Sequence, residues 1–255
     1  MILTLDIGNT NIKTALFDGE KMVQYWRITT NRNMSSDEYG ILLANLFRHN
    51  GLEMSVVTGI IMSSVVPSIN FTIEHMCKNY FGFEPMQVKT GIKTGINIRY
   101  DNPRELGSDR IANAVAAWEL YGGPCIFIDF GTATTYGVMS AKGEFLGGAI
   151  CPGLKLSAEA LVDKAAKLPK FELVKPESVI GKNTIANLQS GIVYGYVGQV
   201  IYLIRKMKEE LNAPDAKVIA TGGMAVLIAS ETDQINVLDG LLTLKGLRLI
   251  YEKNV

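Results

Sequence analysis

Two short stretches combine a carboxylate, a glycine and several hydroxyl or amide side chains directly after an apolar run. They are DIGNTN at residues 6–11 and DFGTATT at residues 129–135. Glycine lets the main chain turn sharply and leaves N–H groups open to a ligand. Thr and Asn add donors that suit phosphate oxygens, and an aspartate at a strand end can hold a cation against those phosphates. The pattern predicts two phosphate-binding loops, and Lys13 could add a positive charge to the first.

The two loops lie in longer segments, residues 3–22 and 126–145, that match each other at a constant offset of nearly half the 255-residue chain. Equivalent positions are Asp6 and Asp129, Gly8 and Gly131, Thr10 and Ala133, and Leu16 and Met139. An ordinary tight hairpin would explain one copy, but two copies with matched apolar lead-ins favour a functional pair. We therefore expect two similar half-domains, at residues 1–117 and 118–255.

The strands around the first loop can be placed from their turn residues. Apolar runs at 2–8, 11–17 and 22–28, with the Asp18-Gly19 turn between the last two, predict antiparallel strands. A Ser-x-x-Glu capping box begins at Ser35 and predicts a helix that stops at Gly51, before a buried strand at 59–66. This βαβ pattern makes the sheet mixed, and the expected fold class is α/β.

The turn geometry argues against two common nucleotide sites. In a Rossmann domain the glycine-rich turn opens a helix, whereas both turns here open a second strand. A P-loop would require the pattern GxxxxGK[ST], which the sequence lacks.

A long helical pattern covers residues 184–211 and contains Gly191, Gly195 and Gly198. Each glycine inside a helix costs about 1 kcal/mol relative to alanine. Close packing against another backbone would offset this cost, either within one subunit or between two subunits.

The composition excludes several functional classes. Apolar residues make up 47% and charged residues 20%, which is typical of a globular protein with a substantial core. Lys plus Arg equals Asp plus Glu at 25 each, so there is no basic excess for nucleic acid or a membrane surface. No apolar run approaches the roughly 18 residues of a membrane span, and the N-terminus has no signal-peptide pattern.

Cysteine and histidine usage is also informative. Three isolated cysteines fit a reducing cytoplasm better than a disulfide framework. The two histidines, His49 and His75, lie in unrelated helical stretches, which argues against a zinc site or a histidine-dependent triad. We therefore expect a cytoplasmic protein.

The unrepeated segment YDNPRELGSDR at residues 100–110 lies between the copies and feeds a helix. We expect Ser108 to be the N-cap and Asp109 to lie in the first turn, where the helix dipole should lower its pKa. Asp109 could merely complement that dipole, and Arg104 and Arg110 could be solvated surface charges. Tyr100 could be an aromatic packed at the base of the loop.

These motifs carry a family resemblance. The paired loops, with a late glycine pair at Gly222-Gly223, resemble the ATP-binding core of actin, the hexokinases and acetate kinase. With SSVVP at 63–67, the 100–110 segment and GGAICPG at 147–153, the chain resembles the type III pantothenate kinases over essentially its full length. The resemblance implies a duplicated actin-like or ribonuclease H-like fold, whose two mixed-sheet half-domains flank an ATP cleft.

The resemblance also implies an activity, which is transfer of a phosphoryl group from ATP to the primary hydroxyl of pantothenate in coenzyme A biosynthesis. It assigns the general base to Asp109 and a monovalent cation, K⁺ or ammonium, to Asp129. It assigns Mg²⁺ to Asp6 and implies a homodimer. Implied substrate contacts are Tyr100, Gly107, Ser108, Asp109, Arg110 and Thr184, although Thr184 could be only a helix N-cap. Implied ATP contacts are Asp6, Ile7, Gly8, Asn9, Thr10, Asn11, Ile12, Lys13 and Thr132.

Two other functions stay open at this point. A regulatory relative could keep the fold and lose the chemistry, but it would not need Asp6, Asp109 and Asp129, which are all present. An actin-like filament protein or chaperone ATPase would need inserted domains for which 255 residues leave little room.

Overall fold

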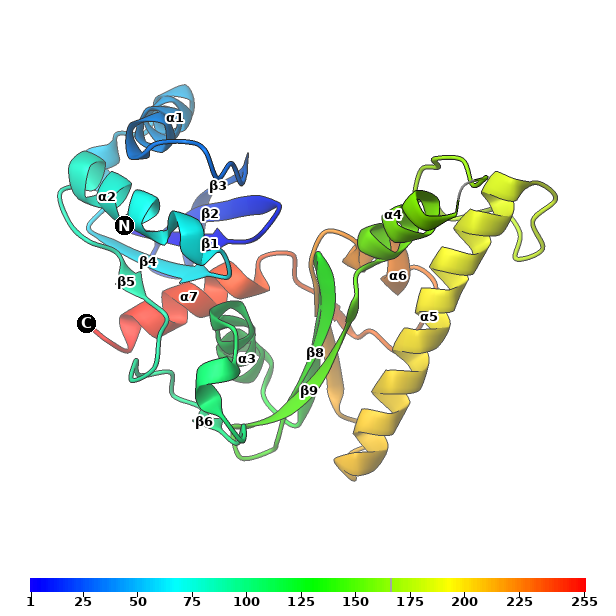
Figure 1. The fold of residues 1–255 in the computed structure, drawn as a ribbon. Coiled ribbons are helices and arrows are strands. Elements are labelled where there is room, and N and C mark those ends of the chain that lie inside the picture. The colour runs from blue at the N-terminus through cyan, green and yellow to red at the C-terminus, as the bar shows by residue number, and fades with distance from the viewer. Residues whose placement is uncertain (166) are drawn as a thin grey trace. The chain divides into compact units, whose positions relative to one another are not determined.

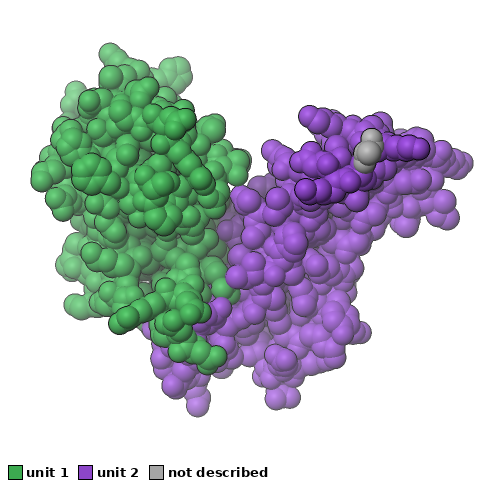
Figure 2. Space-filling model, in the orientation of Figure 1, with its two compact units in different colours: residues 1–95, 101–116, 242–255 green, residues 96–100, 117–241 purple. Residues whose placement is uncertain are grey.

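A computed structural model describes residues 1–165 and 167–255. The chain forms two compact units (Figure 2). Unit 1 contains residues 1–95, 101–116 and 242–255, and unit 2 contains residues 96–100 and 117–241. The division of the repeat into halves at residue 117 stays a prediction. The predicted α/β class with two mixed sheets is confirmed.

Unit 1 is built on a five-stranded sheet with the order β3-β2-β1-β4-β5 (Figure 1). Strand β1 runs antiparallel to β2 and parallel to β4, so the predicted mixed sheet is confirmed. The strands are β1 (Ile2–Ile7), β2 (Asn11–Asp18), β3 (Lys21–Thr29), β4 (Gly59–Ser64) and β5 (Met86–Gln87).

Helices cover both faces of this sheet (Figure 1). Helices α1 (Ser36–His49) and α2 (Asn70–Phe81) bury Leu3, Leu5 and Ile7 of β1 on one face. Helix α7 (Leu242–Glu252) packs on β1, β2 and β4. Because side chains alternate along a strand, Asp6 lies on the opposite face from its neighbours Leu5 and Ile7.

The predicted start of α1 is confirmed in detail. Ser35 is the N-cap and accepts a hydrogen bond from the backbone N–H of Glu38, while the Glu38 carboxylate accepts one from the backbone N–H of Ser35. The helix ends at His49, and Gly51 follows with a φ of +69°.

Unit 2 is built on a six-stranded sheet with the order β11-β10-β7-β8-β9-β6. Its strands are β6 (Asn97–Ile98), β7 (Cys125–Phe130), β8 (Ala133–Met139), β9 (Glu144–Pro152), β10 (Lys217–Thr221) and β11 (Val237–Leu238). Its helices are α4 (Leu154–Lys164), α5 (Thr184–Glu210) and α6 (Ala225–Ala229). Helix α3 (Ser108–Tyr121) begins in unit 1 and ends in unit 2.

Helix α5 matches the predicted 184–211 segment closely, and the structure excludes one alternative for Thr184 and one for the glycines. Its N-cap is Asn183, whose side chain accepts a hydrogen bond from Ala186 N–H, so Thr184 is the first helical residue instead. A Cβ added at Gly191, Gly195 or Gly198 would meet nothing within 4 Å. The glycines therefore do not mark close packing within the described part of the chain.

Candidate active site

In unit 1, neighbouring strands bring three polar residues to one place. Asp6 is opposite Lys13 in the β1–β2 pair and opposite Ser63 in the β1–β4 pair, so the three side chains share one face. Ser63 Oγ donates a hydrogen bond to Asp6 Oδ1 at 2.9 Å, and Lys13 Nζ lies 3.7 Å from Asp6 Oδ2. This cluster lies at the carboxyl ends of two parallel strands, where ligands bind in open α/β sheets.

The predicted first phosphate loop is a tight turn between β1 and β2. Gly8 N–H donates to the Asn11 carbonyl at 3.0 Å, which closes the turn. Asn9 and Thr10 are exposed at its tip. Ile7 and Ile12 point into the core, so only their main-chain groups can face a ligand.

Helix α3 brings Asp109 to the same strand ends. The Ser108 hydroxyl accepts a hydrogen bond from Ser64 N–H at 3.0 Å and donates one to Ser64 O at 3.2 Å. Ser108 is the first residue of the helix and not its N-cap, and its hydroxyl bonds to the backbone of β4. Asp109 Oδ1 accepts a hydrogen bond from Arg110 N–H at 2.8 Å. A Cβ at Gly107 would lie 2.5 Å from this oxygen, so glycine makes room for the carboxylate.

The pKa of Asp109 is raised above its ordinary value, which contradicts the expectation from the helix dipole. Burial is the main cause because it removes water from the charged carboxylate. The Arg110 N–H, the Arg110 guanidinium and the Lys13 ammonium act in the opposite direction but do not outweigh burial. A carboxylate with a raised pKa is the stronger base. Arg110 is itself only 6% exposed, so it is not the solvated surface charge considered above.

Unit 2 contains the second predicted loop. Gly131 N–H donates to Ala133 O at 3.1 Å, so this turn is one residue shorter than the first, in which Gly8 reaches Asn11. The repeat therefore shifts by one residue after the turn. Met139 pairs with Cys125 at the start of β7, as Phe17 pairs with Ile2 at the start of β1. The predicted equivalence of Leu16 with Met139 is corrected to Phe17 with Met139.

Glycines allow the main chain to approach the Asp129 carboxylate closely. A Cβ at Gly222, where φ is +95°, would lie 2.5 Å from Asp129 Oδ1, and one at Gly131 would lie 3.6 Å from the same atom. Asp129 pairs with Thr221 across β7 and β10, which brings the late glycine pair to this carboxylate. Gly153 N–H also donates to Thr132 O at 3.1 Å. The Asp129 carboxylate is an oxygen ligand of the kind that hard cations prefer.

A divalent cation fits the first loop in a different way. Within residues 1–165 and 167–255, no three His, Cys, Asp or Glu side chains form a metal-binding group of their own. Mg²⁺ bound with a nucleotide usually takes one or two carboxylates and completes its shell with phosphates and water. The single carboxylate of Asp6, only 12% exposed beside Lys13, fits that arrangement.

The remaining predicted substrate residues are distributed between the units. Gly107, Ser108, Asp109 and Arg110 lie in unit 1, while Tyr100 and Thr184 lie in unit 2. The Tyr100 ring stacks on Phe145 at a centroid distance of 6.1 Å, so it is packed as well as partly exposed. Thr184 is exposed at the start of α5.

Sequence reasoning gave no role to Ser63, Ser64 or Gly153, although it singled out the motifs SSVVP and GGAICPG that contain them. The signal that could have found them is the position of each motif at the carboxyl end of a predicted strand.

The fold and these loops define the class of protein. Two mixed sheets, each with a Gly-containing hairpin turn at an aspartate, are the architecture of the actin-like ATPase and kinase fold. Solved structures with this fold match nearly the whole chain. A protein from Campylobacter jejuni, named as a candidate Baf-family transcriptional activator, has a TM-score of 0.63 and 21% identity, covering 99% of this chain and 98% of that one.

Two dehydratase activators are also similar. (R)-2-Hydroxyglutaryl-CoA dehydratase component A from Acidaminococcus fermentans has a TM-score of 0.57 and 14% identity, covering 98% of this chain and 96% of that one. The activator of 2-hydroxyisocaproyl-CoA dehydratase from Clostridium difficile, solved with bound ADPNP, has a TM-score of 0.52 and 14% identity, covering 99% and 95%. At these identities the likeness shows the fold alone.

The family model described as type III pantothenate kinase matches residues 2–206. The chain therefore belongs to the type III pantothenate kinase family, and it is an ATP-dependent kinase. Among its described helices, none is long and apolar enough to cross a membrane.

Proposed function

We propose that the chain transfers the γ-phosphoryl group of ATP to the primary hydroxyl of pantothenate, giving 4'-phosphopantothenate and ADP in the first step of coenzyme A biosynthesis. The observation that carries this proposal is the position of Asp109. The contact between Ser108 and Ser64 holds it at the strand ends, where the Lys13 charge acts on its pKa. Membership of the family supports pantothenate as the substrate. The buried Asp109 carboxylate, with the cationic groups of Arg110 and Lys13 near it, supports phosphoryl transfer at the first loop.

The transfer would proceed in line. The pantothenate hydroxyl oxygen forms a bond to the γ-phosphorus while the bond from that phosphorus to the β–γ bridging oxygen breaks, and ADP leaves. The hydroxyl proton passes to the Asp109 carboxylate, whose raised pKa favours its acceptance. Because the transition state is loose, neutralisation of charge on the phosphoryl oxygens contributes most to the rate. Lys13 and Arg110 are the residues proposed for this role.

The nucleotide would be held by both loops. Residues 6–13 would bind the phosphates through main-chain N–H groups and the side chains of Asn9, Thr10 and Lys13, and Thr132 would contribute from the second loop. Asp6 would hold Mg²⁺, which supplies charge neutralisation at the β- and γ-phosphates. Asp129 would hold K⁺ or ammonium, and the close approach of the Gly222 main chain to its carboxylate, which a side chain at residue 222 would prevent, supports this role.

Pantothenate would contact the turn of Gly107, Ser108 and Arg110, together with Tyr100 and Thr184. The Arg110 guanidinium is buried and close to Asp109, so it would bind an anionic group, which is either the transferring phosphoryl group or the pantothenate carboxylate. The exposed hydroxyl of Thr184 at the start of α5 is available to a polar substrate group.

A homodimer is also proposed. Gly191, Gly195 and Gly198 lie on α5 with nothing within 4 Å of an added Cβ, so contacts among the described residues do not offset their cost in helix stability. A second copy approaching this face would offset it. The three cysteines, all free, support a cytoplasmic location.

The test uses purified protein with ATP, Mg²⁺ and K⁺, and measures ADP release together with 4'-phosphopantothenate. ADP should form only when pantothenate is added, in equal amounts with the phosphorylated product. An analogue that lacks the primary hydroxyl should give no ADP above background. Absence of pantothenate-dependent turnover would refute the proposal and favour a regulatory relative.

A further inference from the structure

The segment between β3 and α1, residues 30–32, forms hydrogen bonds with the first phosphate loop. We call this segment the strap. Thr30 Oγ1 donates a hydrogen bond to Gly8 O at 2.6 Å, and Thr30 N–H donates to Thr10 O at 3.0 Å. Arg32 Nη2 donates to Asn9 Oδ1 at 3.1 Å. The strap therefore contacts each of the three consecutive residues that form the turn.

These contacts set the direction of the loop amides. A trans peptide carries its carbonyl and its N–H on opposite sides of one plane. When Thr30 holds the carbonyls of Gly8 and Thr10, it therefore also orients the N–H groups of Asn9 and Asn11 away from itself. Main-chain N–H groups of this loop are among the donors that the proposed function assigns to the ATP phosphates. Donors fixed before the ligand arrives need no reorganisation when it binds.

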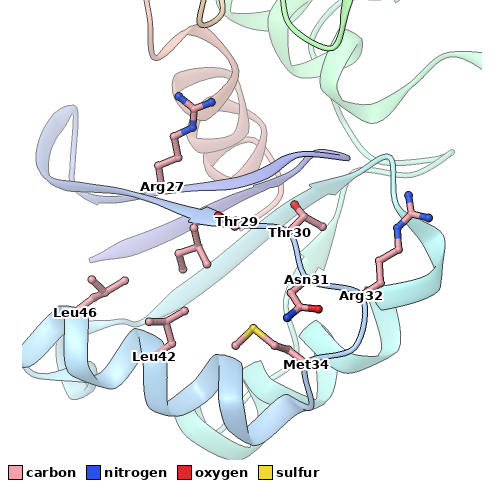
Figure 3. Close-up of a pocket in the computed structure, with 9 residues that line it drawn as sticks. Arg27, Thr29, Thr30, Asn31, Arg32, Met34, Leu42 and Leu46 are labelled. Carbon is pink, nitrogen blue, oxygen red and sulfur yellow. The ribbon is translucent and has the colours of Figure 1, made fainter. Parts of the chain in front are cut away.

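The strap is itself anchored to a rigid part of unit 1. The Tyr39 hydroxyl accepts a hydrogen bond from Asn31 N–H at 3.0 Å and donates one to Asn31 O at 2.9 Å. Tyr39 is only 1% exposed and belongs to the core under α1. On its outer side the strap lines a cavity of about 540 Å³ together with Met34, Leu42 and Leu46 (Figure 3). The strap thus connects the loop to the core under α1, in addition to the flanking strands β1 and β2.

The second loop lacks the corresponding side chain. Gly153 follows β9 as Thr30 follows β3, and its N–H donates to Thr132 O as that of Thr30 donates to Thr10 O. A Cβ at Gly153 would lie 2.3 Å from Thr132 O, so no hydroxyl-bearing side chain fits there. The side-chain contact to the turn carbonyl is therefore specific to the first loop.

We infer that Thr30 is a positioning residue for the first phosphate loop, acting through the Gly8 carbonyl, and that Arg32 supports it through Asn9. The inference rests on the proposed role of this loop in binding ATP. It assigns no contact between Thr30 and the substrate or the nucleotide.

The experiment compares Thr30→Val, which removes the hydroxyl with little change of shape, with Thr30→Ser, which keeps it. We expect Thr30→Val to lower kcat/KM for ATP about tenfold, equivalent to about 1.4 kcal/mol. KM for pantothenate should stay within twofold, and Thr30→Ser should restore most of the loss. The matched control is Thr29→Val, which removes an exposed hydroxyl one residue earlier.

Two further measurements test the inference independently of the identity of the phosphoryl acceptor. Calorimetry with ATP and Mg²⁺ should show a several-fold weaker Kd for Thr30→Val, whether or not pantothenate is the acceptor. Arg32→Ala changes an exposed side chain, so it should fold normally and weaken ATP binding about threefold. If both variants bind ATP as the wild type does, the inference is wrong. If the variants bind ATP more weakly as expected but the wild type shows no pantothenate-dependent release of ADP, the proposed function is wrong instead.

Discussion

A methyl group added at Gly246 should displace the helix that carries Asp109. Gly246 lies in α7, and a Cβ built on it would be 1.9 Å from the Ala112 carbonyl oxygen and 2.6 Å from its carbon. Both atoms belong to the backbone of α3, so no side-chain rotation can relieve the clash. The helices must separate by roughly 1.5 Å to reach an ordinary contact distance.

The expected magnitudes follow from this separation. Overpacking in a dense interior costs up to about 3 kcal/mol, while replacing glycine by alanine inside a helix recovers about 1 kcal/mol. The net loss of unfolding free energy for Gly246→Ala should be about 2 kcal/mol. Asp109 lies one turn before Ala112, so its carboxylate should move by about 1 Å, which can lower kcat about 100-fold.

The assay measures thermal or urea unfolding together with kcat at saturating ATP and pantothenate. Gly240→Ala is the matched control, because a Cβ at Gly240 would meet nothing within 4 Å and the residue is exposed. The control should keep both stability and kcat. If Gly246→Ala keeps kcat within threefold of the wild type, the contact between α3 and α7 does not position Asp109.

The remaining predictions concern the base, the cation and the dimer. Asp109→Asn should lower kcat by about 100-fold or more while calorimetry shows ATP binding nearly unchanged, and a near-normal rate would reduce Asp109 to a helix-terminal acid. Because burial raises the folded-state pKa of Asp109, its stabilising contribution is present when it is protonated and is lost as pH rises through that pKa. Asp109→Asn should therefore raise the midpoint of thermal unfolding at neutral pH, and an unchanged or lower midpoint would contradict burial as the main cause. The same pKa predicts that wild-type kcat/KM falls on the acidic side with a midpoint above the ordinary value for aspartate, and a midpoint at that ordinary value would contradict it. Replacing K⁺ with Na⁺ should depress activity strongly, and equal rates would refute the assignment to Asp129. Gly195→Ala should weaken the proposed dimer in sedimentation measurements, whereas a variant that is monomeric like the wild type and gains about 1 kcal/mol of stability would show that no second copy covers this face of α5.

Features that depend on a few neighbouring residues could be predicted from the sequence. The turn after Asp6, the capping box at Ser35 and the start of α5 within one residue all follow from local backbone preferences. The mixed sheet of unit 1 followed from the same signals, because a helix between two strand patterns requires a parallel crossover.

The bonds that position the site join residues far apart in sequence, and no local pattern marks them. Ser108 and Ser64 are 44 residues apart, and Thr30 and Gly8 are 22 apart. The pKa of Asp109 was expected to fall because a helix start is visible in the sequence, whereas burial by other segments is not. Burial is the larger effect.

The role of a glycine in a helix is also hidden when the group that it packs against is far away in the sequence. In the sequence, Gly246 only lowers the helix propensity of its segment. In the structure, it lets α7 pack closely against the carbonyl of Ala112, a residue more than a hundred positions earlier. The shorter second turn was also not visible in the sequence. The apolar residues of the two copies still match each other when the alignment after the turn is shifted by one residue. The hydrogen bonds that close the two turns, and the pairing of Phe17 and Met139 with their partner strands, reveal it.

The contact between Ser108 and Ser64 has a consequence for how this protein can change over evolution. The Ser108 hydroxyl bonds to the backbone N–H and carbonyl of residue 64. Every amino acid except proline has both of these groups. A substitution at position 64 therefore leaves this contact with α3 possible, although it removes the hydrogen bond that Ser64 Oγ accepts from Val66 N–H, whereas position 108 needs its hydroxyl. Tyr39 recognises Asn31 in the same way. The positions of α3 and of the strap therefore depend on the main chain at residues 64 and 31 and on the hydroxyls of Ser108 and Tyr39.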